Sequence, residues 1–315
     1  MVKKKKHEFK LSIIDNMCSE LSSGPQKEYW RQLKKLEGRP NEQKYMSDFT
    51  LINHFKELLF DDKIDLQFQE QDNTTVGSLD YPIDLEELKT ATKILKTGKG
   101  TGLDIIRNEM LVPLVDLYPE LVLRAFNEIL EEHGTLCKDW LHSLVSAIHE
   151  KGAKEDPDNY RGISLMSCLG KLFLTIINNR LMDFCISKGL ISSSELGFVL
   201  GNRTSDPHII LHNLIQKYCH KRKKRLYGCF VDFSKAFDTI PRDKLFQKLL
   251  NKDINGKFYD CLVNLYTEDK SCVKIGECVT KTIKPNQGVK QGCILSPILF
   301  NIYLSDMQQE LKRDV

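Results

Sequence analysis

Residues 229–245 of this 315-residue chain read CFVDFSKAFDTIPRDKL. The apolar residues leading to Asp232 predict a short β-strand, and the stretch that begins at RDKL has helical spacing. A second carboxylate, Asp238, lies between the two. A carboxylate at the end of a strand is a common ligand of a hard divalent cation such as Mg²⁺. The structural alternative is that Asp232 ends the strand and Asp238 caps a turn or the helix.

Residues 286–304, NQGVKQGCILSPILFNIYL, form a second informative segment. Gln-Gly pairs at 287–288 and 291–292 precede a Ser-Pro pair at 296–297, which is expected to begin an amphipathic helix. Glycines let a backbone approach a ligand closely, and a nearby helix N-terminus favours phosphate or another anion. The same residues also describe an ordinary loop followed by a Ser-capped helix.

The rest of the chain combines helices and strands without regular βαβ alternation, which favours an α+β fold. Helices are expected within residues 48–62, 84–100, 119–134, 168–189, 204–224, 242–250 and 296–312. Strands are expected within residues 143–152, 158–167 and 226–233, and a hairpin around Gly276 within 271–285. Asp84, followed by Glu87, predicts a capping box. Asp206 before Pro207 predicts another N-cap, and the polar residues 63–81 predict a linker.

Composition limits the class of protein. Hydrophobic residues make up 41% and charged residues 28%, with a net charge of +3, so the chain is expected to be globular and is not uniformly basic. Its length suggests about two domains. No apolar run reaches the roughly eighteen residues of a membrane span, and none follows the charged N-terminus, so we expect an intracellular protein that is not secreted. The ten cysteines contain no Cys-x-x-Cys pair, which favours reduced thiols.

The densest positive run comprises Lys221, Arg222, Lys223, Lys224 and Arg225. Such a run is suited to contact a nucleic-acid phosphate backbone or to act as a nuclear-import signal. A solvated helix end is the structural alternative.

Together, VDFSKAFD and the later QGxxxSPxLFNxYLxD resemble the palm motifs of reverse transcriptases, specifically those of non-LTR (long interspersed element type) retrotransposons. Three upstream stretches resemble that family's fingers segments, in the family's order: GKGTGLDIIRNEML, WLHSLVSAIHEKGAKEDPDNYRGISLMSCLGKLF and ELGFVLGNRTSD. LINHFKELL resembles the stretch that links the family's endonuclease to its polymerase. The similarity covers roughly residues 48–312.

The resemblance implies a right-hand polymerase fold with fingers and an incomplete palm, preceded by a helical N-terminal extension. Residues 1–80 would be this extension and linker, 81–225 the fingers with interleaved palm elements, and 226–315 part of the palm. The implied reaction is two-metal nucleotidyl transfer, with an RNA template, a DNA primer, dNTPs and two Mg²⁺ ions in the complete enzyme. No membrane partner is implied, protein partners are left open, and the compartment is the nucleus or the cytoplasm.

The resemblance also assigns site residues. Asp232 would be the catalytic, metal-binding carboxylate, and the Phe233 carbonyl would help to bind the metal on the nucleotide side. Phe237 matches the steric gate that excludes a ribose 2′-hydroxyl and so selects deoxynucleotides. Asp238 is better explained as support for the turn.

The remaining assignments concern the incoming nucleotide. Gln291 and Gly292 match the family's contact with the nucleotide and the template base. Arg161 is the best candidate to grip the triphosphate, because a guanidinium binds phosphate oxygens in a bidentate way. Lys151 would assist it. The structural alternative for Arg161 is a surface position on a strand.

Several departures from the family pattern carry expectations of their own. Glu150 stands where the family usually has lysine, and a glutamate in a triphosphate site would repel the ligand. Ile105 replaces a glycine, which would strain a turn that needs positive φ. The Tyr-x-Asp-Asp hairpin, which in the family pairs beside the Asp232 strand, is not found in these residues. We therefore expect no polymerase activity from this chain alone and an aggregation-prone strand edge. The alternatives are a non-catalytic nucleic-acid-binding remnant and a decayed gene copy.

Overall fold

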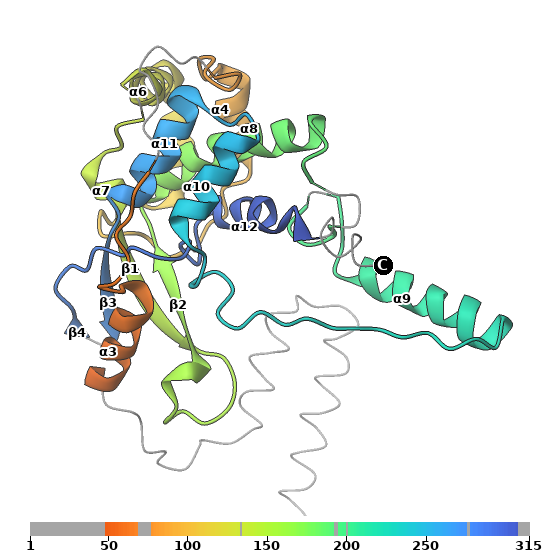
Figure 1. Ribbon diagram of the computed structural model, residues 1–315. Coiled ribbons are helices and arrows are strands. Elements are labelled where there is room, and N and C mark those ends of the chain that lie inside the picture. The colour runs from red at the N-terminus through yellow and green to blue at the C-terminus, as the bar shows by residue number, and fades with distance from the viewer. Residues whose placement is uncertain are drawn as a thin grey trace, which may run out of the picture. The chain divides into compact units, whose positions relative to one another are not determined.

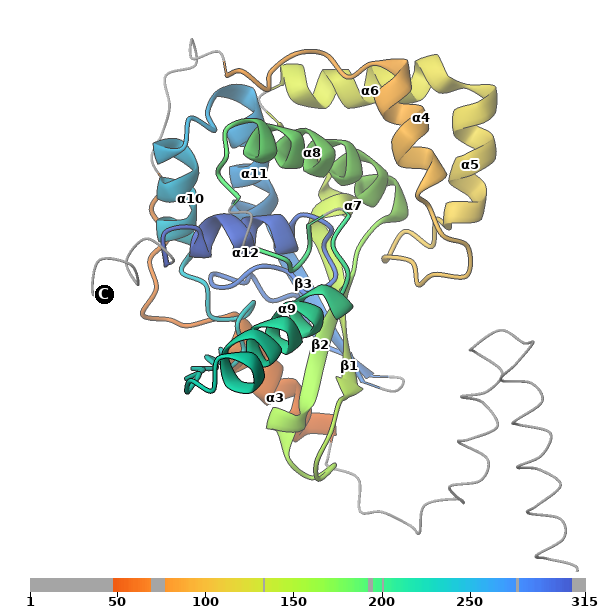
Figure 2. The ribbon, with the colours of Figure 1, turned by 90° about the vertical axis from the view of Figure 1, so that its right-hand side faces the viewer.

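The computed structural model describes residues 48–68, 77–132, 134–191, 195–199, 201–275 and 278–307. These residues form a mixed α and β structure, in agreement with the expected class. A small sheet and helix α3 lie at one end, and most other helices pack together at the other (Figures 1 and 2). The helical extension is expected within residues 1–80; its first 47 residues lie outside the described part of the chain.

The helices are α3 (Asp48–Leu59), α4 (Leu85–Lys93), α5 (Asn108–Leu117), α6 (Pro119–Glu131), α7 (Lys138–Leu141), α8 (Cys168–Ser187), α9 (Ser205–Ile215), α10 (Arg242–Asn251), α11 (Gly256–Thr267) and α12 (Ser296–Leu304). The strands are β1 (His142–His149), β2 (Tyr160–Leu165), β3 (Lys270–Ile275) and β4 (Cys278–Val279). A 3₁₀ turn covers Pro157–Asn159, and α9 continues as a π-helical turn over Gln216–Lys221. The sequence expectations omit α5, α7 and α11. The other α-helices and strands agree with predicted ranges to within one residue, with His142, Asn251 and Lys270 lying just outside them.

The sheet has the strand order β2-β1-β3-β4. Strand β1 is antiparallel to β2 and parallel to β3, and β3 and β4 form the antiparallel hairpin expected from the sequence. Helix α3 covers the sheet because Phe55 packs against Val145 and Val273. A Cβ atom at Gly162 would lie 2.7 Å from the Phe55 ring, so glycine at this position of β2 allows α3 to pack closely.

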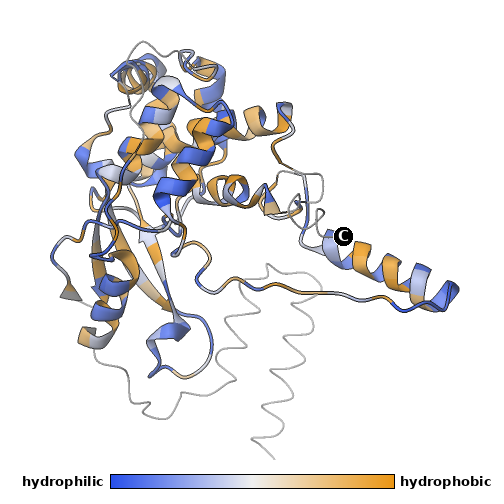
Figure 3. Cartoon of the chain, in the orientation of Figure 1, coloured by the Kyte–Doolittle hydropathy of each residue, from blue (hydrophilic) through white to orange (hydrophobic). Residues whose placement is uncertain are grey.

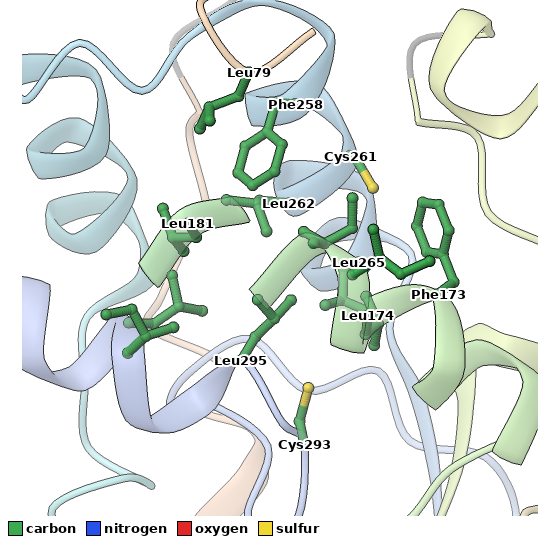
Figure 4. Packing of buried hydrophobic residues seen from close by; sticks show 14 of the residues in the cluster. Leu79, Phe173, Leu174, Leu181, Phe258, Cys261, Leu262, Leu265, Cys293 and Leu295 are labelled. Atoms are coloured by element: carbon green, nitrogen blue, oxygen red, sulfur yellow. The ribbon is translucent and has the colours of Figure 1, made fainter. Parts of the chain in front are cut away.

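The main hydrophobic core lies among the helices, with α8 buried along most of its length. Figure 4 shows Phe173 and Leu181 of α8 in the same cluster as Leu262 and Leu265 of α11, with Leu295 before α12. Each fully buried side chain of this size contributes about 1.5–3 kcal/mol relative to an exposed one. The core therefore fixes α11 and also α12, which carries the second sequence motif together with the loop before it.

Arg180 of α8 ties this core to the start of α4. Its guanidinium donates to both carboxylate oxygens of Glu87, at 2.6 and 2.7 Å, and to the carbonyls of Tyr81 and Pro82. Glu87 also accepts from the Asp84 amide and completes the capping box that the sequence predicts. One carboxylate thus helps to cap the start of a helix and neutralises a buried cation.

Residues 226–233 depart most clearly from expectation, because they are extended and exposed but belong to no strand (Figure 1). Tyr227 and Phe230 are 82% and 85% exposed, and apolar colour runs along this open segment in Figure 3. Apolar alternation gives strand propensity, but a strand also needs a neighbour that pairs with its backbone groups. None of the four described strands pairs with it. The predicted strand ending at Asp232 is therefore wrong for this structure.

Local backbone details test three smaller expectations. Asp206 is not the N-cap of α9; it lies inside the helix and accepts from the Arg203 amide at 2.7 Å. Ser296 does not cap α12 either; it is the first residue of the helix, and its hydroxyl donates to the Lys290 carbonyl at 2.7 Å. Ile105 does adopt the left-handed conformation, with φ of +61°, so the positive φ is confirmed at a residue whose branched side chain disfavours it.

The cysteines and the helices also answer expectations from composition. Eight of the cysteines within the described residues are free thiols, in agreement with the prediction from their spacing. Among the helices that the structure describes, none combines the length and apolar character needed to cross a bilayer.

Candidate functional site

The two segments that the sequence analysis singles out meet through their backbones. The Gly288 amide donates to the Ile240 carbonyl at 2.9 Å, and the Val289 amide donates to the Phe237 carbonyl at 2.7 Å. Gly288 has φ of +69°, and a Cβ atom there would lie 2.6 Å from the Asp238 carbonyl oxygen. Glycine is therefore required for the loop to approach the turn this closely.

Gln291 and Gly292 lie between this turn and strand β2. The Gln291 side-chain amide donates to Asp238 Oδ2 at 2.6 Å, and the Gln291 carbonyl accepts from the Ser164 amide at 2.7 Å. Gly292 has φ of +103°, and a Cβ atom there would lie 2.9 Å from the Ser164 carbonyl oxygen. The loop is thus held against the strand that carries Arg161.

Asp238 is a partly buried carboxyl group with a changed acidity. Burial raises its pKa from the ordinary value to about 6, and the Gln291 hydrogen bond, Lys235 and Arg161 partly offset this effect. The turn itself is closed by a hydrogen bond from the Asp238 amide to the Lys235 carbonyl. These contacts make Asp238 a support for the turn and for Gln291.

Arg161 lies on β2, opposite Ile148 of β1. Its side chain is 60% exposed, and its Nε lies 2.6 Å from Glu150 Oε2. Glu150, which replaces the family's usual lysine, is therefore the ion-pair partner of Arg161, the candidate residue for triphosphate binding. Lys151, the next residue, is exposed.

Phe237 lies in an aromatic cluster that joins the turn to α12. Its ring stacks on Phe300 with centroids 5.1 Å apart and planes inclined by 19°, and it meets Phe198 edge-on at 6.2 Å. Phe233 also contacts Phe300 edge-on, at 6.4 Å. The candidate gate residue is half-buried and is fixed from α12.

Asp232 lies on the exposed segment that precedes Phe233, away from any paired strand. Across the described ranges, no group of three or more His, Cys, Asp or Glu side chains is arranged to hold a metal ion. Mg²⁺ requires near-octahedral oxygen coordination, and two such ions need several shared carboxylates. One exposed carboxylate and one backbone carbonyl do not fit a two-metal site.

The basic run 221–225 is exposed throughout and begins at the end of the π-helical turn that follows α9. Lys217 Nζ of that turn lies 5.5 Å from the Tyr218 ring centroid, and the guanidinium of Arg222, directly after the turn, lies 5.4 Å from it. Both phosphate and water can reach these exposed cations. The geometry is therefore compatible with a nucleic-acid contact and with a solvated helix end.

A buried ion trio beneath the loop was not anticipated. Arg242 donates to the Gly288 carbonyl, and its Nη2 lies 3.2 Å from Asp269 Oδ2, while Lys290 Nζ lies 2.8 Å from Asp269 Oδ1. All three side chains are almost fully buried. The one sequence signal is that Arg242 and Lys290 lie inside the two motifs, whereas Asp269 belongs to neither.

Comparison with known proteins agrees with this arrangement of motifs. Residues 148–315 match the family described as reverse transcriptase (RNA-dependent DNA polymerase), and this match covers just over half of the chain. The chain belongs to the reverse transcriptase family.

Its relatives come from non-LTR retrotransposons, the type expected from the motifs. The chain is 28% identical over 252 residues to the probable RNA-directed DNA polymerase from transposon BS of Drosophila melanogaster, which covers 76% of this chain and 27% of the relative. It is 28% identical over 229 residues to the polymerase from mobile element jockey of the same species, covering 71% and 24%. It is 24% identical over 236 residues to the R2 Pol polyprotein of Nasonia vitripennis, covering 75% and 22%. The chain thus spans about a quarter of the length of these curated relatives.

Proposed function

We propose that this chain supplies the fingers and part of the palm of an RNA-directed DNA polymerase of a non-LTR retrotransposon. Residues 81–225 are the fingers with interleaved palm elements, 226–315 belong to the palm, and 1–80 are an extension and linker. The observation that carries this proposal is the meeting of the Phe237-Asp238 turn with the Gln291-Gly292 loop, beside the strand of Arg161.

Each residue near this meeting point has a proposed role. Arg161 and Lys151 bind the triphosphate of a dNTP, since both are exposed cations at the β1–β2 hairpin. Gln291 and Gly292 contact the nucleotide and the template base. Phe237 excludes the ribose 2′-hydroxyl, and its packing on Phe300 supplies the rigidity that such a gate requires.

Asp232 and the Phe233 carbonyl are proposed as the first ligands of a two-Mg²⁺ centre in the complete enzyme. The described residues do not supply the remaining ligands. We therefore propose that this chain alone is inactive in nucleotidyl transfer. The free cysteines fit a reducing intracellular compartment, in the nucleus or the cytoplasm.

A second candidate function is non-catalytic binding of nucleic acid. The exposed position of Asp232 and the exposed run Lys221–Arg225 favour it. In either function, the run would contact the phosphate backbone of the RNA template or DNA primer.

Primer extension, measured together with binding, tests the proposed inactivity and the binding of nucleic acid. The full chain is incubated with an RNA template, an annealed DNA primer, dNTPs and Mg²⁺, with Asp232→Asn as the control. No extension, combined with salt-sensitive binding of the primed template, is the expected result and leaves the chain as a binding part of the polymerase. Extension that Asp232→Asn abolishes would contradict the proposed inactivity. The absence of both binding and extension would contradict both functions and favour a decayed copy.

A further inference from the structure

Glu150 forms an ion pair with Arg161, the cation proposed to bind a nucleotide phosphate. Arg161 lies on β2 and Glu150 directly follows β1, and Arg161 Nε lies 2.6 Å from Glu150 Oε2. Both side chains are substantially exposed, so a ligand that arrives from solvent can reach the pair. The carboxylate and a phosphate oxygen would compete for the same guanidinium hydrogens.

The backbone of the β1–β2 hairpin keeps Glu150 in place for this contact. The Glu150 amide donates to the Asn159 carbonyl at 2.9 Å, and the Asn159 side-chain amide donates to the Ala153 carbonyl at 2.9 Å. The Tyr160 hydroxyl donates to the Lys154 carbonyl at 3.0 Å. These bonds fix the loop between the strands, so forming the ion pair requires ordering of little more than two side chains.

Lys235, a neighbouring cation, is paired in the same way. Its Nζ lies 2.8 Å from Asp158 Oδ1, and this contact lowers the pKa of the Asp158 carboxyl group from its ordinary value. Arg161 and Lys235 both influence Asp238 electrostatically, so both lie near the turn of the proposed site. The positive charge available there to an anion is therefore reduced by carboxylates of the same hairpin.

We propose that Glu150 is a built-in competitor for Arg161 that weakens the binding of polyphosphate ligands, including the triphosphate of a dNTP. This inference rests on the proposed nucleotide site and adds a residue that sets its affinity. A triphosphate must displace Glu150 from Arg161 and must also overcome its negative charge. Removing that charge without changing the side-chain shape should therefore tighten binding.

The test measures binding of inorganic tripolyphosphate and of dTTP to the full chain by calorimetry, in buffer without divalent cations. The variants are Glu150→Gln, Arg161→Gln and the double variant, and Glu155→Gln serves as the matched control. Glu155 is an exposed glutamate in the same loop, so it removes the same charge at a different position. An exposed ion pair typically changes an equilibrium constant by up to about five-fold, and the removed repulsion adds to this, so Glu150→Gln should tighten binding by roughly three- to ten-fold.

The expected pattern is a gain with Glu150→Gln, little change with Glu155→Gln and no gain when Glu150→Gln is combined with Arg161→Gln. If Arg161→Gln weakens dTTP binding but Glu150→Gln leaves it unchanged, the nucleotide site stands and the competitor inference is overturned. An equal gain from Glu155→Gln would also overturn it, because general charge would then explain the effect. If neither the wild type nor Glu150→Gln binds either ligand, both the inference and the nucleotide site fall.

Discussion

The substitution Asp269→Asn tests whether the buried ion trio holds the two motif segments together. Asp269 is the carboxylate of this trio; its side chain is 1% exposed and lies 3.2 Å from Arg242 Nη2 and 2.8 Å from Lys290 Nζ. Asparagine keeps the shape of the side chain but leaves two buried cations without a counter-charge. Arg242, which donates to the Gly288 carbonyl, and Lys290 hold the loop that carries Gln291 in place. Both would then lose the negative charge that attracts them.

The expected loss follows from what each cation retains. Removing one partner of a buried ion pair costs about 3–5 kcal/mol. Arg242 still donates to three carbonyls, of Gly288, Tyr266 and Pro285, each at 2.8 Å, so we expect the lower end, about 3 kcal/mol. Lys290→Met instead leaves a neutral Arg242–Asp269 pair and should cost no more than about 1 kcal/mol.

Urea unfolding of the full chain, followed by circular dichroism, measures these differences. With a slope of roughly 3 kcal/mol per molar urea, Asp269→Asn should lower the midpoint by about 1 M. Glu131→Gln is the control, because Glu131 forms an equally short pair with Lys257, at 2.7 Å, but its side chain is 65% exposed. That substitution should cost less than about 1 kcal/mol. The reasoning fails if Asp269→Asn costs no more than Glu131→Gln, or if Lys290→Met costs as much as Asp269→Asn.

Three further predictions concern the turn, the loop and the basic run. Because the pKa of Asp238 is raised to about 6, the folded state holds this proton more tightly than the unfolded state. The free energy of unfolding of the wild type should therefore fall, relative to Asp238→Asn, by about 2 kcal/mol between pH 4 and pH 6, and parallel curves in urea titrations would contradict this. Gly288→Ala should cost at least about 1 kcal/mol more than Gly98→Ala in the same titrations, since both glycines have positive φ but only Gly288 lies against a backbone carbonyl; equal losses would show that the close approach is not tight. Replacing all five cations of 221–225 by glutamine should make the plot of log binding constant against log salt shallower by up to about 4 on primed RNA, while thermal melting stays unchanged; an unchanged slope would leave the run as a solvated helix end.

Local signals account for the elements that the sequence predicts correctly. The capping box at Asp84 and Glu87 closes as expected, because all of its atoms lie within one turn. The β1–β2 hairpin and α8 follow from short-range alternation and helical spacing. Helix α11 is absent from the sequence expectations although its apolar residues Phe258, Leu262 and Leu265 have helical spacing. This helix was therefore predictable from local sequence.

Long-range contacts account for what the sequence could not predict. Motif resemblance identifies Gln291 and Asp238 separately, but nothing local indicates that the two side chains bond to each other. The same holds for Asp269, a single carboxylate between a helix and a strand that becomes the centre of a buried trio. The pairing of Glu150 with Arg161 depends on the strand register, which turns an expected repulsive residue into a neighbour of a cation.

The segment 226–233 gives the sharpest test of how complete the site is. A metal-binding carboxylate works only if its backbone is held within about half an ångström, and pairing with a neighbouring strand is the usual means of holding it. Here the backbone around Asp232 has no such neighbour among the described strands, although the turn that follows is firmly bonded to the loop. We therefore expect amides of 226–233 to exchange with deuterium almost as fast as those of an unfolded peptide, while amides in the buried middle of α8, residues 172–181, are protected.

Peptide-level mass spectrometry after brief deuterium exposure measures both regions in one experiment. The α8 peptide serves as the internal control, since low protection there would mean that the chain is unfolded as a whole. Protection of 226–233 equal to that of α8 would contradict the reasoning, because the segment would then be paired in solution. Fast exchange confined to this segment would mean that the turn and loop of the site form without it. Fixing Asp232 and completing the metal ligands would then depend on the same neighbour, because a strand that pairs with 226–233 is also placed to bring a second carboxylate beside Asp232.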